Sequence, residues 1–240
     1  MEEKHDIVIP LGTKSFANLN FEIRIAIASI RKYCKFLNRI IIVSQINPIK
    51  SLGDDIIWIN QDDIFTHDKD ANIIHKVRAA IEQVPDLTDD FIMWSDDQFI
   101  TKDTYWSDTT PRYMKIYDQN TKEWFDSMAS KRLWYKRLIK CFKRFGNNGY
   151  GCRFFNPHIP SPMNKHKFIE MCNAFPYQKE DGITIYDLYY NFIGEKGVPN
   201  FDEYHVQSGE TDWKDCRWVG YFNSSMRKKE FINKLVELFS

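Results

Sequence analysis

Long hydrophobic runs are missing from this chain of 240 residues. A run such as Arg39–Val43 (RIIIV) is far shorter than the stretch of about 20 apolar residues that a membrane-spanning helix needs. The opening residues MEEKHD also lack the apolar core of a secretory signal peptide. We therefore expect a soluble, unexported protein that works in the cytoplasm.

Cysteines are few and irregularly placed. The chain has five, an odd number, and no two of them form a C-x-x-C pair. Disulfide-rich secreted folds and thiolate zinc sites both need regularly spaced cysteines, so the sequence predicts neither. The reducing environment of the cytoplasm fits this pattern.

Net charge is also absent, since 33 acidic residues balance 33 basic ones. A protein that coats nucleic acid needs a broad positive field, so nucleic acid is not an expected partner. No linker rich in proline, glycine or serine and no internal repeat divides the chain. With 43% hydrophobic residues the chain can bury a large core, and we predict a single domain over residues 1–240.

The first hundred residues contain a regular alternation of strands and helices. Apolar, β-branched runs predict strands, and apolar residues spaced three and four apart predict helices. The predicted strands are Asp6–Pro10, Arg39–Val43, Asp55–Ile59 and Asp90–Trp94, and the predicted helices are Phe21–Cys34 and Ala71–Gln83. This order predicts an α/β fold with a Rossmann-like, mostly parallel sheet flanked by helices.

Ligands of such sheets bind beyond the carboxyl ends of the strands. The loops at Gly12, Ser44–Gln45 and Ser95–Asp97 each follow a predicted strand, so we expect them to share one rim.

The second half of the chain has weaker patterns. Thr121–Phe145 is predicted as one long helix and Asn147–Gly151 as a break, with shorter helices at Asn164–Cys172 and Ile183–Ile193.

Two adjacent carboxylates, Asp96 and Asp97, follow the fourth predicted strand within Phe91–Ile100 (FIMWSDDQFI). Two like charges at the end of a buried strand are unfavourable unless solvent or a cation offsets them. Mg²⁺ and Mn²⁺ prefer such oxygen ligands and bridge them to substrate phosphates. We predict Asp97 as the direct metal ligand, and Asp96 as a group that binds the metal's water or a nucleotide ribose. The alternative is a turn in which the two aspartates only cap the strand.

Three stretches around these aspartates resemble a known family: Asn20–Ser44, Gln61–Phe65 (QDDIF) and Asn72–Phe99. They look like the central conserved region of the Stealth family, sugar-1-phosphate transferases of capsule-type polysaccharide synthesis whose nucleotide-sugar domain is similar to GT-A glycosyltransferases. Weaker similarity recurs at Asn156–Met171 and around Tyr186–Tyr190. The resemblance implies a GT-A-like domain, a nucleotide-sugar donor and a divalent metal, Mn²⁺ or Mg²⁺.

The opening of the chain departs from that family. The family has Tyr-Thr-Trp after its first strand, whereas this chain has Ile9-Pro10-Leu11-Gly12, which looks more like an ordinary GT-A glycosyltransferase. We predict a metal-dependent glycosyltransferase of surface polysaccharide or glycoconjugate synthesis. Residues 1–100 would bind the nucleotide-sugar, and residues 101–240 a glycan or lipid-linked acceptor. The alternatives are transfer of a sugar-1-phosphate from the same donor site and a non-catalytic nucleotide-sugar-binding module.

The resemblance also suggests residues that contact the donor. Pro10, Leu11 and Gly12 form the loop after the first strand. Arg24 falls on the Glu-Leu-Arg start of a family helix, where it would reach the donor phosphates. The alternative for Arg24 is a solvated helix face.

Asn72, His75 and Lys76 are spaced three and four apart, so they share one face of the helix that precedes the aspartate strand. A cation on this face would neutralise a diphosphate. The alternative for Lys76 is an ordinary surface lysine.

Candidates for the remaining chemistry lie in the second half. His158, between two prolines, matches the family's histidine and is a candidate metal ligand or a hydrogen-bond donor to the leaving diphosphate. His205 is the other candidate metal ligand. An acceptor hydroxyl needs a base opposite the leaving group, and Asp181 and Asp187 are the candidates, although either also suits an ordinary turn or helix.

Residues 131–145 (KRLWYKRLIKCFKRF) carry an apolar and a basic stripe. The apolar stripe is Trp134, Leu138, Cys141 and Phe145, and the basic stripe is Arg132, Lys136, Lys140 and Arg144. A basic amphipathic helix can bind an anionic membrane surface or an anionic acceptor, which makes this segment a candidate for peripheral membrane contact. The alternative is a helix packed on the sheet with a solvated basic face.

Two other enzyme classes fit less well. Nucleotidyltransferases also bind metal through carboxylates beside an α/β sheet, but they carry a glycine-rich phosphate loop, and Leu11–Ser15 has one glycine. A DNA-base glycosyltransferase would need a phosphate-binding surface, and only the basic stripe offers one.

Overall fold

The computed structural model describes most of the chain. The described residues are 2–12, 21–48, 52–53, 55–65, 69–147, 149–155, 159–179, 184–200, 204–206, 213, 216–221 and 225–239.

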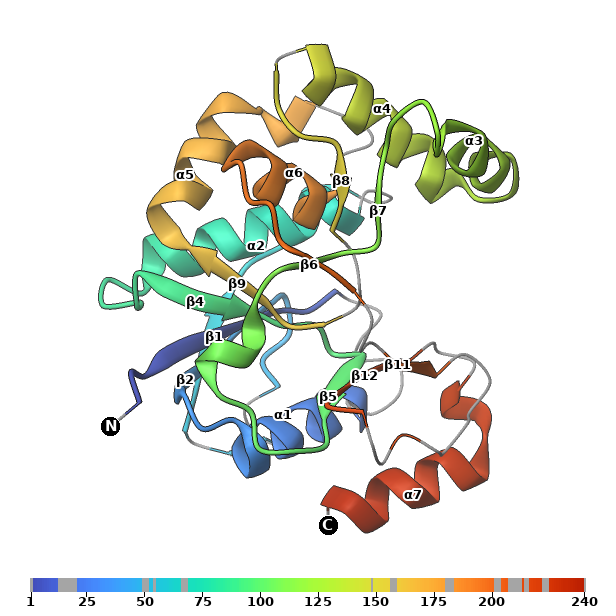
Figure 1. Cartoon of the computed structure of the whole chain (residues 1–240). Coiled ribbons are helices and arrows are strands. Elements are labelled where there is room, and N and C mark those ends of the chain that lie inside the picture. Colours follow the sequence, from blue (N-terminus) through green and yellow to red (C-terminus); the bar gives the residue numbers. More distant parts are fainter. Residues whose placement is uncertain are drawn as a thin grey trace.

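A five-stranded sheet forms the centre of the molecule (Figure 1). Its strands, in spatial order, are β3 (Ile56–Asn60), β2 (Leu37–Ser44), β1 (His5–Pro10), β4 (Asp90–Met93) and β9 (Ser161–Asn164). The first four are parallel, which confirms the predicted mostly parallel sheet, and β9 joins β4 in antiparallel orientation. β9 was not predicted.

Helices cover both faces of this sheet. Successive β1 residues point to opposite sides: Ile7 and Ile9 pack with α1 (Phe21–Tyr33), and Val8 packs with the cluster that includes α2 (Lys69–Gln83). Both faces of a sheet strand can be apolar only when both are covered, so the continuous apolar sequence of these strands follows from this arrangement.

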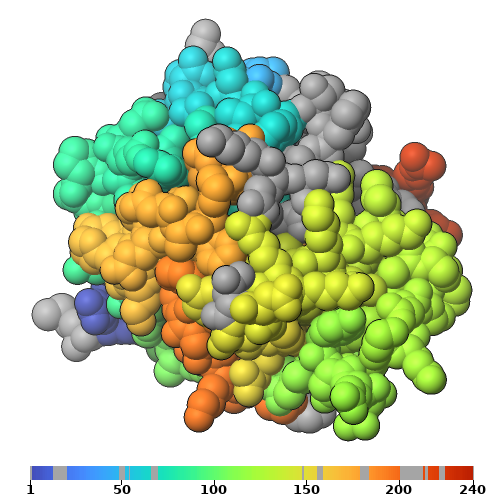
Figure 2. Space-filling model, turned by 90° about the horizontal axis from the view of Figure 1, so that it is seen from above, coloured from blue at the N-terminus to red at the C-terminus, as the bar shows by residue number. Residues whose placement is uncertain are grey.

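The α2 side also holds α5 (Lys165–Ala174) and α6 (Ile185–Phe192), which Figure 2 shows in orange beside the turquoise α2. Both helices were predicted to within a few residues. Asn164 is the N-cap residue of α5. Its side-chain oxygen accepts hydrogen bonds from the backbone N–H groups of His166 and Lys167, at 3.1 and 3.2 Å.

A second, smaller sheet continues from the end of β4. β5 (Gln98–Ile100) pairs antiparallel with β12 (Trp218–Tyr221), which pairs parallel with β11 (Tyr204–Val206). The last helix, α7 (Lys229–Phe239), contacts α1, where Lys32 Nζ donates to the carbonyl oxygen of Leu238 at 2.7 Å. This sheet brings the end of the chain to the turn that contains Asp96 and Asp97.

The other described strands and the 3₁₀ helices are short. Two strand pairs, β6 (Arg112–Tyr113) with β10 (Val198–Pro199) and β7 (Lys115–Ile116) with β8 (Arg153–Phe154), accompany the 3₁₀ helices Trp106–Thr109, Tyr177–Lys179 and Ser225–Arg227.

The single helix predicted over Thr121–Phe145 is wrong. The structure has α3 (Lys122–Lys131) and α4 (Leu133–Asn147), separated by Arg132 in an extended conformation (φ −139°, ψ 124°). A continuous helix would hold Phe125 and Phe142 about 26 Å apart, whereas the hairpin brings their ring centroids to 5.8 Å. Burial of both aromatic side chains therefore favours the break, although neither proline nor glycine marks it.

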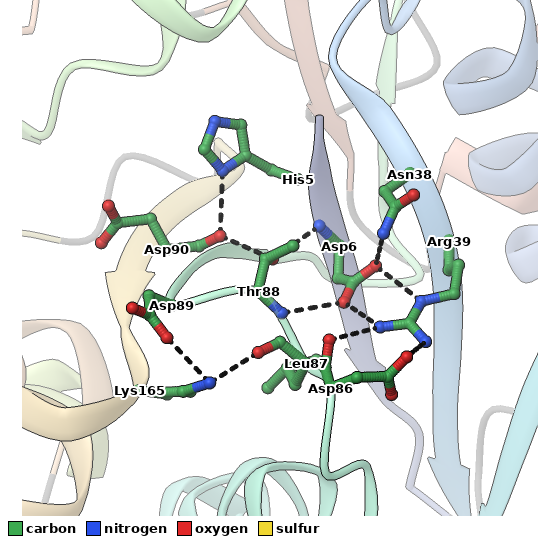
Figure 3. A network of polar contacts seen from close by, with 10 residues as sticks. All are labelled: His5, Asp6, Asn38, Arg39, Asp86, Leu87, Thr88, Asp89, Asp90 and Lys165. Atoms are coloured by element: carbon green, nitrogen blue, oxygen red, sulfur yellow. Dashed lines mark hydrogen bonds and ion pairs between the residues drawn. The ribbon is translucent and has the colours of Figure 1, made fainter. Parts of the chain in front are cut away.

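The amino-terminal end of the sheet is fixed by a buried carboxylate (Figure 3). Asp6 has no exposed surface and accepts hydrogen bonds from Arg39 Nε and Nη2 at 3.0 and 2.7 Å, from Asn38 Nδ2 at 2.8 Å and from Thr88 N at 3.0 Å. The hydrogen bond to Asp6 raises the pKa of the Arg39 guanidinium. Removing one partner of such a buried pair costs about 3–5 kcal/mol. This network joins β1, β2 and the turn before β4 at the edge opposite the predicted rim.

All five cysteines are free thiols. No helix in the described ranges is long and apolar enough to cross a membrane.

Candidate active site

The loops that follow β1, β2 and β4 lie at one edge of the sheet, because these strands are parallel. This confirms the predicted rim. The loop that follows β3, Gln61–Phe65, lies at the same edge, since β3 is parallel to β2.

The turn Ser95–Asp97 is built by the residues on either side of it. Trp94 extends β4, since its backbone N–H donates to Val8 O at 2.9 Å. Its buried indole Nε1 donates to Gln98 O at 3.2 Å, across the turn. Asp96 and Asp97 are both half-buried, so they lie at the surface of the rim on a turn that is closed behind them.

Two tyrosines hold this turn from opposite sides, and we call them the tyrosine clamp. The Tyr221 backbone N–H donates to Asp97 O at 3.1 Å, and its hydroxyl lies 3.4 Å from Asp96 O. On the other side, the hydroxyl of Tyr186 in α6 is hydrogen-bonded to the Ser95 side chain. Burial raises the pKa of both hydroxyls, so both stay protonated and able to donate.

Negative charge gathers around the tyrosine clamp. After burial, the carboxylates of Glu22, Asp97 and Asp96 are the causes that raise the pKa of Tyr221. No three His, Cys, Asp or Glu side chains among the described residues are placed to hold a metal by themselves. Mg²⁺ and Mn²⁺ are commonly held by one or two carboxylates together with substrate phosphates, so the Asp96–Asp97 pair has the right donor atoms for either ion.

The three candidate residues on α2 all contact the loop after β3. Asn72 Oδ1 accepts from the backbone N–H groups of Ile64 and Phe65, both at 2.9 Å, and its Nδ2 donates to Phe65 O at 2.6 Å. His75 Nε2 lies 2.8 Å from Gln61 Nε2. The three residues therefore share one face of the helix, as predicted, and that face fixes the segment Gln61–Phe65.

Lys76 is buried rather than a surface lysine. Its Nζ donates to Leu11 O at 2.7 Å and forms an ion pair with Asp63. The side chain is 2% exposed against 21% for that of Asp63. Lys76 thus joins the loop after β1 to the loop after β3, and it lies beneath the rim.

His75 faces a shallow groove of about 260 Å³. Burial, followed by the charge of Arg78, lowers the pKa of the imidazole. The other ring nitrogen, Nδ1, lies 3.3 Å from the Tyr177 hydroxyl. The groove is lined by Gln61, His75, Arg78, Ala79, Glu82, Tyr177 and Gln178.

The remaining donor-site candidates occupy the start of the rim. Pro10 is the buried last residue of β1, and the Leu11 N–H donates to Val43 O at 2.9 Å. Gly12 is exposed, and a Cβ atom added to it would meet no atom within 4 Å, so close packing does not require glycine there. Arg24 is exposed in the first turn of α1.

Asp187, a predicted base, lies in the core. Its side chain has no exposed surface, and Oδ1 accepts from the Phe155 backbone N–H at 2.6 Å. Burial raises the pKa of the carboxyl to about 7. A base must reach the acceptor hydroxyl, so this burial favours a structural role, and the catalytic role of Asp187 stays a prediction.

The other predictions of catalytic and metal-binding residues fall outside the described residues. His158 and Asp181 are among the residues that the structure does not describe, and for His205 only the backbone is described, in β11 opposite Gly220.

Sequence reasoning missed Asp63 and the tyrosine clamp. Asp63 follows β3 as Asp97 follows β4, so the rule that placed Asp97 at the rim also applied to Asp63. No local signal marks Tyr221, because the pairing of β12 with β5 brings it to the turn.

No family model matches this chain, and no curated protein matches its sequence. Among solved structures, it is similar to the galactosyltransferase LgtC, determined with donor and acceptor sugar analogues, at a TM-score of 0.50 and 12% identity over 98% of this chain and 96% of LgtC. The bifunctional glycosyltransferase WbbM is similar at a TM-score of 0.51 and 12% identity over all of this chain, which spans half the length of WbbM.

At such low identity the likeness concerns the fold alone. The resemblance to the Stealth family stays a prediction. The chain has the mixed α/β fold of GT-A glycosyltransferases, with a mostly parallel central sheet and flanking helices.

Proposed function

We propose that this protein is a metal-dependent glycosyltransferase that transfers a sugar from a nucleotide-sugar to a glycan or lipid-linked acceptor. The observation that carries the proposal is the turn Ser95–Asp97. It presents two half-buried carboxylates at the carboxyl edge of a GT-A sheet and is held on both sides by the tyrosine clamp.

Different residues of the rim would bind different parts of the donor and its metal. Asp97 would ligate Mn²⁺ or Mg²⁺ directly, and Asp96 would bind the metal's water or the donor ribose. The metal, when bound, supplies positive charge that stabilises the departing diphosphate. Arg24, exposed in the first turn of α1, is the cation that we assign to the donor phosphates.

Other residues act by holding the rim in shape. Lys76 fixes the loops after β1 and β3 relative to each other, and Asn72 and His75 fix the segment Gln61–Phe65. Because these loops are already held in place, donor binding loses less conformational entropy than it would with mobile loops. The acceptor would bind over residues 101–240, where the predicted bases Asp181 and Asp187 and the predicted His158 and His205 lie.

Substitution of the aspartate pair tests the proposal. Asp97→Asn removes charge but keeps shape, so we expect turnover of a nucleotide-sugar panel in Mn²⁺ to fall by at least about 100-fold, with the melting temperature unchanged. Asp96→Asn should mainly raise the donor KM. Asp126→Asn is a matched control, because that exposed carboxylate pairs within α3, with Lys122. Full activity of both rim variants would contradict the proposal.

The product separates the proposed reaction from its closest alternative. Transfer of a bare sugar releases a nucleoside diphosphate, whereas transfer of a sugar-1-phosphate releases a nucleoside monophosphate. The segments that resemble the Stealth family include α1, α2 and β4, the elements that build this rim, so the alternative would use the same donor site. The opening Ile9-Pro10-Leu11-Gly12 favours the diphosphate product.

A further inference from the structure

Basic residues are concentrated in one stretch of an otherwise balanced chain. Residues 127–169 contain no Asp or Glu. They contain ten cations: Lys131, Arg132, Lys136, Arg137, Lys140, Lys143, Arg144, Arg153, Lys165 and Lys167. Because the whole chain has 33 residues of each sign, this stretch is strongly positive against a neutral background.

Helix α4 carries its lysines on one face and its buried apolar residues on another. Leu138, Phe142 and Phe145 are buried, and the exposed residues Lys136, Lys140 and Lys143 follow one another at intervals of four and three positions. These three lysines therefore lie along one outer face of the helix. Figures 1 and 2 show α3 and α4 at the margin of the molecule, on the α2 side of the sheet.

Large apolar side chains are also exposed on the α3–α4 hairpin. Leu133, which begins α4, is 65% exposed, and Trp124 in α3 is 37% exposed. The Trp124 ring contacts the ring of Tyr135 at 5.7 Å between centroids, and Lys115 Nζ lies 5.0 Å from its centroid. Leucine and tryptophan beside lysines are typical of a surface that sits at the boundary of lipid headgroups and acyl chains.

We propose that this face of the α3–α4 hairpin, defined by Trp124, Leu133, Lys136, Lys140 and Lys143, binds the surface of a membrane that contains anionic phospholipids. Charge complementarity identifies the partner as anionic, and the exposed Leu133 and Trp124 favour a bilayer over a soluble polyanion, which offers nothing apolar to contact. The proposal holds whether or not the protein transfers a sugar.

Vesicle flotation of the full chain tests this proposal without nucleotide or acceptor. We expect binding to vesicles of phosphatidylcholine mixed with phosphatidylglycerol and none to phosphatidylcholine alone. Replacing Lys136, Lys140 and Lys143 with Gln should weaken vesicle binding on the order of 100-fold. Each lysine near an anionic membrane surface multiplies the binding constant by a factor of roughly five, and the variant loses three of them. Leu133→Ser should weaken it by a smaller factor, and added salt should mimic the lysine variant.

The control is a second triple variant, Lys196, Lys228 and Lys229→Gln, which removes equal charge from exposed lysines elsewhere. It should bind the anionic vesicles as the wild type does, and melting temperatures should show that every variant is folded. The proposal is overturned if the wild type does not float with anionic vesicles, or if the control loses as much binding. It is also overturned if dextran sulfate competes fully and Leu133→Ser has no effect, because the face would then be a general polyanion site.

Discussion

At the scale of single residues, Asp187 is a fully buried carboxyl group that accepts from the Phe155 backbone N–H, and its titration should affect stability. Burial raises its pKa from 3.8 to about 7, and the charge of Asp70 adds to that effect. Between about pH 4 and pH 7 the folded protein therefore holds a proton that the unfolded chain releases. Stability is then greatest below this window and falls as the pH rises through it.

The variant Asp187→Asn removes this titration and keeps an oxygen for the Phe155 N–H. We expect it to be more stable than the wild type at pH 8, by roughly 2–4 kcal/mol, with the difference vanishing towards pH 4. Urea denaturation at both pH values measures this, with Asp126→Asn as the exposed control. An equal effect at both pH values would contradict the prediction. Turnover that survives the substitution would also exclude Asp187 as the base.

The sequence predicted the positions of some site residues in the fold better than those of others. Asp96 and Asp97 were predicted at the rim because the strand before them and their charge are both local features. Lys76 was assigned to a helix face correctly, but its burial depends on Leu11 and Asp63, which come from two other loops. Tyr221 contacts Asp96 from 125 positions away, and no periodicity in the sequence encodes that contact.

At the scale of elements, the tyrosine clamp couples α6 and β12 to the turn Ser95–Asp97, which we propose binds the metal. Tyr186→Phe and Tyr221→Phe each remove a hydroxyl but keep the ring. We expect each to raise the Mn²⁺ concentration needed for half-maximal activity by roughly 2- to 12-fold, the effect of one net hydrogen bond, and saturating Mn²⁺ should restore turnover.

Tyr189→Phe is the matched control for this pair. It also removes a hydrogen-bonded hydroxyl from α6, but its partner is the Asn164 backbone N–H, away from the turn. It should lower stability and leave the Mn²⁺ dependence unchanged. A similar change in Mn²⁺ dependence in all three variants would mean that the tyrosines act only through stability.

The elements of the first half were predictable because each carries its own apolar period, and they were found even though β4 pairs with β1 and not with β3, the strand that precedes it in the chain. The second half was less so. β9 is four residues long and contains Pro162, which removes a backbone donor, so it has no strand pattern of its own. The α3–α4 break depends on where Phe125 and Phe142 meet, which is a tertiary effect.

At the scale of the whole molecule, donor and metal should stabilise the fold together. A ligand that binds only the folded state at 100 times its Kd adds about 2.7 kcal/mol, or roughly 5–10 °C in Tm for a chain of this size. We expect that shift when a nucleoside diphosphate and Mn²⁺ are both present, and little with either alone. Asp97→Asn should abolish it. Thermal denaturation with and without EDTA measures the effect, and a shift that persists in EDTA would argue against metal bridging.

The place of β9 in the sheet has a consequence for biosynthesis. Phe91 of β4 pairs with Met163 of β9, 72 positions later in the chain (163 minus 91). At translation rates of about 5–20 residues per second, β9 is therefore synthesised roughly 4–14 s after β4. During that interval the outer edge of β4 presents unpaired N–H and C=O groups, flanked by apolar side chains, to other nascent chains. Synthesis of β9 therefore ends the interval in which this edge of β4 is open to pairing with another chain.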